Sequence, residues 1–224
     1  MKLLMIVANY PNAGHPYAGA FNERSAHVLQ ELGHQVEVVA PRPYVPRSLA
    51  ALHTRIADLR VVADHPDNVD ALAAATKSSG KPLPVLVDID PGIRRTGVAS
   101  PEAAVALADR IARHSALRFA GVQYYCGVQQ HIGSYADRRA AVEDPTAYLR
   151  SVLGALQNAG HAPDVISGGG TGTHSIDGDL GVLTELQAGS YVFMDRQYND
   201  CDLTGDRANP FETALFVDAR VISA

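Results

Sequence analysis

Cysteine is scarce in this chain: only Cys126 and Cys201 occur among 224 residues, and neither stands in a C-x-x-C pair. Such scarcity argues against a disulfide framework or a zinc knuckle, and it fits a reducing, cytoplasmic location. Runs of lysine or arginine are also lacking, and the formal net charge is −5. Without a basic patch to neutralise a phosphate backbone, nucleic acid is not expected as a partner.

Long hydrophobic runs are absent too. The apolar run over residues 3–8 is far shorter than a membrane span, and Asn9, Tyr10 and Pro11 follow it in place of a small-residue cleavage site. We therefore expect a first buried strand here and no membrane partner. The overall content of 46% hydrophobic and 19% charged residues predicts a folded globular chain, in which one large domain or two small ones remain open.

Short apolar runs alternate with helix-like stretches over most of the length. The runs are continuous rather than alternating, which is typical of strands buried on both faces of a parallel sheet. Strands are predicted at residues 3–8, 36–40, 59–63, 85–87, 119–122, 165–166, 191–194 and 215–217, and helices at 21–32, 49–56, 68–75, 101–114 and 146–159. Ser100 and Pro101 are the expected N-cap and first residue of the fourth helix. This pattern predicts an α/β fold, closed as a barrel or open as a doubly wound sheet.

The segment from Ser167 to Thr173 is the most informative stretch. It reads Ser-Gly-Gly-Gly-Thr-Gly-Thr and follows the apolar run Val165-Ile166. Backbone N–H groups of such a loop can converge on an anion while the hydroxyls donate beside them. A phosphate-binding loop is one interpretation and a flexible turn is the other, since the segment matches neither standard nucleotide-binding glycine motif.

Polar loops follow two more of the predicted strands. Asp88 and Asp90 lead into a loop with Arg94 and Arg95, where an arginine could reach a ligand or pair with one of these carboxylates. Tyr125 follows the strand at 119–122 and could donate a proton, stack on a ligand or serve in packing. Loops at the same ends of parallel strands share one face, so these residues and the glycine loop could form one site. The acidic segment 195–202 matches no metal motif and is predicted to be a solvated loop.

Several ordered blocks between residues 50 and 195 resemble the D-threonine aldolase and D-serine dehydratase family of pyridoxal-phosphate enzymes. The blocks are residues 60–69, 87–98, 121–125, 130–132, 167–173 and 185–195. The resemblance implies a parallel β/α barrel of the alanine-racemase N-terminal type, truncated or incomplete in this chain. It implies that Gly168, Gly169, Gly170, Thr171, Gly172 and Thr173 hold the cofactor phosphate, that Arg95 sits against the cofactor ring, and that Tyr125 is a candidate catalytic acid or base.

The same resemblance implies a lyase that cleaves β-hydroxy-D-amino acids to glycine and an aldehyde, or dehydrates D-serine. The family's Schiff-base lysine stands in a Pro-His-x-Lys-Thr context, and this chain has only Lys2, Lys77 and Lys81, none in that setting. The family's divalent-metal ligands lie in a C-terminal domain that would begin near Ala224. We therefore expect no metal site in this chain and an impaired activity.

Residues 1–47 resemble a different family, the N-terminal β-α-β unit of glycosyltransferases with two Rossmann-like domains. The similarity lies in residues 1–11, 19–24 and 31–41, and a junction is predicted in the proline-rich segment 41–48. A chimera is thus expected, with a Rossmann-like segment at 1–47 and the barrel portion at 48–224. Unpaired strand edges of an incomplete barrel could also support a homodimer.

Three functions remain open from the sequence alone: a pyridoxal-phosphate-binding lyase acting on a D-amino acid, a sugar-nucleotide-binding domain, and a non-catalytic scaffold. Binding of pyridoxal phosphate distinguishes the first from the other two.

Overall fold

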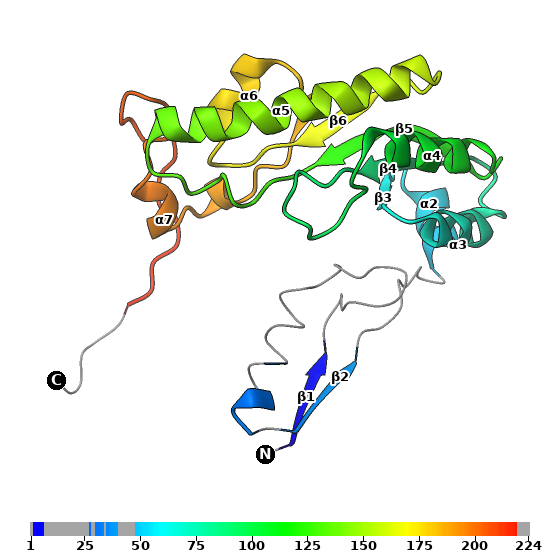
Figure 1. The fold of residues 1–224 in the computed structure, drawn as a ribbon, viewed down its shortest axis with the longest axis horizontal. Coiled ribbons are helices and arrows are strands. Elements are labelled where there is room, and N and C mark those ends of the chain that lie inside the picture. Colours follow the sequence, from blue (N-terminus) through cyan, green and yellow to red (C-terminus); the bar gives the residue numbers. More distant parts are fainter. Residues whose placement is uncertain (1, 7–26, 28–29, 34, 40–47, 219–224) are drawn as a thin grey trace. The chain divides into compact units, whose positions relative to one another are not determined.

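The computed structural model describes residues 2–6, 27, 30–33, 35–39 and 48–218 (Figure 1). The chain divides into two compact units, residues 1–120 and residues 121–224. Within the described ranges, no helix combines the length and apolar character needed to cross a membrane.

The described strands form two sheets. A two-stranded sheet pairs β1 (Lys2–Ile6) with β2 (Gln35–Val39) in parallel. A five-stranded sheet has the order β3-β4-β5-β6-β7, which is also the order in the chain. Its strands are β3 (Val61–Ala63), β4 (Leu83–Asp88), β5 (Leu117–Tyr124), β6 (Val165–Gly168) and β7 (Glu185–Leu186). Because a doubly wound sheet reverses its strand order at a switch point, the unbroken order favours the barrel closure for these strands.

The first unit carries the helices α2 (Leu49–Arg55), α3 (Pro66–Thr76) and α4 (Pro101–Ala112). The side chain of Ser100 accepts a hydrogen bond from the Ala103 amide at 3.2 Å, with Pro101 at the first helical position, so the predicted N-terminus of α4 is confirmed. The core lies between α4 and β4, whose inward side chains are fully buried. Most of the predicted helix at 21–32 and most of the predicted junction at 41–48 lie outside the described residues.

The second unit contains α5 (Tyr135–Asn158), α6 (His174–Leu180), a short 3₁₀ helix η1 (Ser190–Val192) and α7 (Arg196–Asn199). Figure 1 shows α5 lying along β6, with α6 on the same side. Leu149, Val152 and Leu156 of α5 and Val122 of β5 are among the buried core residues of this unit.

Pro145 lies inside α5, although the sequence predicted a helix beginning only after it. Proline has no N–H to give to the carbonyl of Ala141 one turn earlier. The Gln129 side chain supplies the missing donor, with its Nε2 at 2.6 Å from the Ala141 oxygen. Tyr124 of β5 donates its hydroxyl to the Pro145 carbonyl at 2.7 Å. These two bonds allow the helix to continue through the proline and join it to β5.

The two strands predicted nearest the C-terminus are wrong. Residues 190–192 form η1, and the described residues 215–217 are in no strand. Phe193 is 56% exposed and Phe216 78% exposed. Apolar composition alone therefore overestimated burial in this part of the chain.

Candidate functional site

The glycine-threonine loop occupies the connection from β6 to α6, with Gly168 as the last strand residue and Thr173 just before the helix. The loop is ordered by its own side chains: the Gly170 amide donates to Thr173 Oγ1 at 3.1 Å, and His174 Nδ1 lies 2.8 Å from the Thr171 carbonyl. These bonds give the loop a defined conformation.

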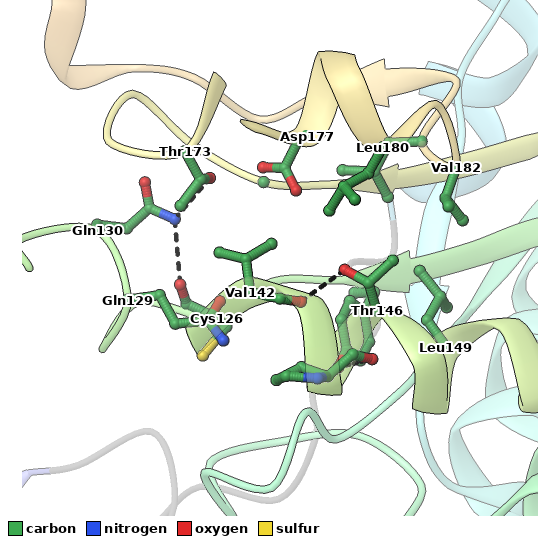
Figure 2. Close-up of a pocket in the computed structure, with 14 residues that line it drawn as sticks. Cys126, Gln129, Gln130, Val142, Thr146, Leu149, Thr173, Asp177, Leu180 and Val182 are labelled. Atoms are coloured by element: carbon green, nitrogen blue, oxygen red, sulfur yellow. Dashed lines mark hydrogen bonds between the residues drawn. The ribbon is translucent and has the colours of Figure 1, made fainter. Parts of the chain in front are cut away.

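Gln130 holds this loop from the neighbouring β5–α5 connection. Its Oε1 accepts from the Gly172 amide at 2.9 Å, while its Nε2 donates to Thr173 Oγ1 and to the Cys126 carbonyl, each at 3.2 Å (Figure 2). Its side chain is 1% exposed. A Cβ on Gly170 would lie 2.5 Å from Gln130 Oε1, and a Cβ on Gly172 would collide with the Gln130 backbone. Glycine is thus required here by the close approach of Gln130.

A cavity of about 320 Å³ opens on the other side of the loop. Its walls come from the connections that follow β5, β6 and β7, and its lining residues are Tyr125, Gly170, Thr171, Gln187, Gly189, Ser190 and Tyr198. Ligand sites in β/α barrels form at this end of the strands. The structure therefore brings Tyr125 together with Gly170 and Thr171, as the sequence predicted for one site.

The chemistry of this lining suits a phosphate ester. The lining residues include two tyrosines, a threonine and a serine, all of which carry hydroxyls, together with Gln187 and two glycines. Such donors bind phosphate oxygens without a full positive charge. Thr171 Oγ1 also accepts from the Tyr191 amide at 3.2 Å, which orients the threonine, and Gln187 Nε2 donates to Ser167 Oγ at 3.0 Å. The residues present thus fit the phosphate group of pyridoxal phosphate.

Tyr198 is a lining residue that the sequence analysis missed. It lies on α7, is 4% exposed, and its ring packs at a tilt against His131, with 4.2 Å between ring centroids. Burial raises the pKa of its phenol, so Tyr198 enters the cavity as a neutral hydroxyl. Its position far from the loop in sequence, inside a polar segment, gave no local signal.

Arg95 lies in the first unit, in the connection between β4 and α4. Asp90, at the start of that connection, accepts hydrogen bonds from the backbone amides of Gly92 and Arg94 at 2.9 and 3.0 Å. Asp90 therefore shapes its own loop through backbone donors. The role of Arg95 at a cofactor ring stays a prediction.

Lysines are few in the described residues and none lines the cavity. Lys81 donates to the Ile56 carbonyl at 3.1 Å, and Lys77 follows the last turn of α3. The acidic segment is structural in its described contacts: Asp195 caps α7 and Asp200 pairs with Arg196. Across the part of the chain that the structure describes, no three His, Cys, Asp or Glu side chains gather as metal ligands.

Comparison with known proteins gives a family and several relatives. Residues 3–197 match the family described as alanine racemase, N-terminal domain. A 3-hydroxy-D-aspartate aldolase of Paracoccus denitrificans (strain Pd 1222) is 38% identical over 178 residues, covering 78% of this chain and 46% of the relative. A D-threonine aldolase of Arthrobacter sp is 35% identical over 195 residues, covering 87% of this chain and 50% of the relative. The chain thus spans about half the length of these curated relatives.

Among solved structures, the D-threonine aldolase from Filomicrobium marinum matches with a TM-score of 0.70 and 28% identity, over 95% of this chain and 60% of that one. The family match begins at residue 3, inside the segment expected to come from a glycosyltransferase. These three relatives are all aldolases, so they give no support to a glycosyltransferase origin for residues 1–47.

Proposed function

The chain belongs to the alanine racemase N-terminal domain family, and on that premise we propose that it is the pyridoxal-phosphate-binding barrel portion of a D-amino-acid lyase. The observation that carries the proposal is the cavity of about 320 Å³ lined by the glycine-threonine loop and by neutral hydroxyl donors. Relatives named as aldolases for 3-hydroxy-D-aspartate and D-threonine support this class of reaction. The proposed substrate is a β-hydroxy-D-amino acid, cleaved to glycine and an aldehyde.

In this proposal the loop Gly168–Thr173 binds the cofactor phosphate through the Thr171 hydroxyl and through backbone amides other than those of Gly170, Gly172 and Thr173, which donate within the site. Gln130 is proposed to hold the loop in this conformation, because its side-chain amide bonds both the Gly172 amide and the Thr173 hydroxyl. When bound, pyridoxal phosphate supplies an electron sink for the substrate α-carbon. Arg95 is proposed to lie against the cofactor ring.

Tyr125 and Tyr198 both line the cavity, and they are proposed to have different roles. Tyr198 keeps its proton because burial raises the pKa of its phenol, so it binds and orients as a donor. Tyr125 is the candidate to accept or return a proton at the substrate hydroxyl. Since no lysine lines the cavity, we propose that this chain holds the cofactor mainly through its phosphate and that its lyase activity is impaired.

The test is an absorbance titration of the chain with pyridoxal phosphate, followed by borohydride reduction and mass mapping. A saturable spectral shift without a reduced lysine adduct is the expected result. Pyridoxal, which lacks the phosphate, is the matched control and should bind far more weakly. An adduct at Lys77 or Lys81 would overturn the proposed impairment, and absence of binding would overturn the proposed function.

A further inference from the structure

Asp177 is a buried carboxyl group that the proposed chemistry does not use. It lies on α6 directly beneath the glycine-threonine loop and is 8% exposed. Its Oδ2 atom is buried and has no hydrogen-bond partner among the described residues. Figure 2 shows this side chain at a second, smaller cavity, of about 20 Å³, whose lining also includes Val142, Leu149 and Leu180. Polar side chains, among them Gln130, Thr146 and Thr173, complete this lining, so the surroundings of Asp177 are mixed.

Asp177 is nevertheless in close contact with the loop. A Cβ on Gly169 would collide with Asp177 Oδ2, so this oxygen lies against the loop backbone. The other link is Thr173, whose carbonyl accepts from the Asp177 amide at 2.8 Å and whose side chain partly offsets the rise that burial causes in the pKa of Asp177. Thr173 Oγ1 itself accepts from the Gly170 amide and from Gln130. Asp177 is thus linked to the loop directly at Gly169 and, through Thr173, at Gly170.

The charged groups around Asp177 are engaged elsewhere. From α5, Arg139 pairs with Glu143 and with Asp179, and Arg150 donates to the Leu180 carbonyl. On the β7 side, Glu185 accepts from Ser167, and from β5 the Tyr124 hydroxyl donates to Pro145. His174, on the same helix as Asp177, favours the carboxylate electrostatically. Burial acts in the opposite direction and dominates, so the pKa of Asp177 is raised.

We propose that Asp177 is a positioning residue that makes phosphate binding by the loop dependent on pH. As a neutral acid beneath Gly169 and Thr173, it leaves the loop free to bind an anion. As a carboxylate, it places a negative charge directly under the phosphate in a poorly screened site and repels it. By linkage, a phosphate ester that binds to the ionised form must draw a proton onto Asp177. The inference rests on the proposed function, because it concerns the same loop.

The test uses pyridoxine 5′-phosphate, which carries the phosphate but cannot bond covalently to a lysine. Its affinity is measured between about pH 5 and about pH 8 for the wild-type chain, D177N and D179N. Affinity of the wild type and of D179N should fall with rising pH by about tenfold more than that of D177N. D179N is the matched control, since it removes an exposed carboxylate from the same helix.

Parallel pH profiles for the wild type and D177N would overturn the inference while leaving the proposed function standing. Absence of wild-type binding at any pH would instead overturn the proposed function, and this inference with it.

If D177N does not fold, calorimetry of the wild type decides. Titrations with pyridoxine 5′-phosphate in buffers of different ionisation enthalpy should show net proton uptake on binding, above the uptake expected from the phosphate of the ligand. Binding without that additional uptake would overturn the inference.

Discussion

Asp70 in the first unit and Asp177 in the second are both carboxyl groups on helices, but their surroundings shift their pKa values in opposite directions. Asp70 accepts from Arg110 Nε at 2.8 Å and lies 3.0 Å from His114 Nε2, with its side chain 39% exposed. These partners, the Arg110 hydrogen bond foremost, lower its pKa to about 2. The pKa of Asp177 is raised by burial, and its Oδ2 has no hydrogen-bond partner among the described residues.

The difference separates two uses of a carboxyl group. Asp70 on α3 bonds Arg110 of α4 and His114 just after that helix, so its charge joins the two helices. Asp177 lies beneath the proposed phosphate-binding loop, where a charge would oppose an anion. The lowered pKa of Asp70 accompanies a structural ion pair, and the raised pKa of Asp177 accompanies burial next to the glycine-threonine loop.

The largest expected effect comes from filling the space between Asp177 and the loop. G169A adds a Cβ that collides with Asp177 Oδ2 at a residue with φ of 62°. We expect a loss of about 2 kcal/mol of unfolding free energy from overpacking, with loss of pyridoxal phosphate binding. Denaturant unfolding and the absorbance titration measure both. G178A is the control, because a Cβ there meets nothing within 4 Å, and equal losses in both variants would contradict the close contact.

Removing Gln130 should have the next largest effect. Q130A deletes the bonds to the Gly172 amide, the Cys126 carbonyl and Thr173. We expect its unfolding free energy, measured by denaturant unfolding, to fall by about 2 kcal/mol. Q129A deletes a single bond, to Ala141, and should lose about 1 kcal/mol. If the two variants are equally destabilised, Gln130 is not the support of the loop.

The stability of D177N should change with pH relative to the wild type. A raised pKa in the folded state means that the wild type keeps its full stability below about pH 4, the unfolded pKa, and loses part of it as pH rises toward the folded pKa. An asparagine at this position carries no charge. The unfolding free energy of D177N should therefore increase relative to that of the wild type as pH rises. Urea unfolding at several pH values measures the difference, and a constant difference would exclude a pKa shift.

The smallest effect is expected for D70N, with the opposite sign. A folded pKa near 2 means that the ion pair stabilises the wild type above about pH 4 and stops doing so as pH falls through about 2. The advantage should be modest because the pair is partly exposed and screened by salt. Urea unfolding in the R110Q background is the control, where D70N should add little further loss. An undiminished loss there would show that Asp70 acts without Arg110.

Much of the fold could be predicted from the sequence because buried parallel strands have short continuous apolar runs. The runs at residues 85–87, 119–122 and 165–166 lie within β4, β5 and β6. The runs at 191–194 and 215–217 have similar composition, but apart from the buried Met194 their residues are exposed, with Val217 at 87%. Composition alone does not predict which apolar runs pair with a neighbouring strand and become buried. The sequence did not predict that α5 begins before Pro145. The Gln129 side chain donates to the Ala141 carbonyl in place of the missing proline N–H, and no local pattern reveals this contact.

The candidate site was predicted in part. The glycine-threonine loop and Tyr125 were identified because loops after parallel strands meet at one end of the sheet. Gln130 belonged to a block that resembled the family, yet its role depends on the Gly172 amide and the Thr173 hydroxyl, which lie far away in sequence. Asp177 and Tyr198 are isolated polar residues in sequence. Their importance comes from burial, which only the folded chain reveals.

Pro145 also limits how this sequence can evolve. Any other residue at position 145 would restore an N–H toward the Ala141 carbonyl, and that donor would compete with Gln129 for the same oxygen. Conversely, a chain that kept the proline but lost the amide at 129 would leave the carbonyl without its donor. Substitutions at these two positions are therefore coupled, and homologous sequences that have changed one of them are expected to have changed the other.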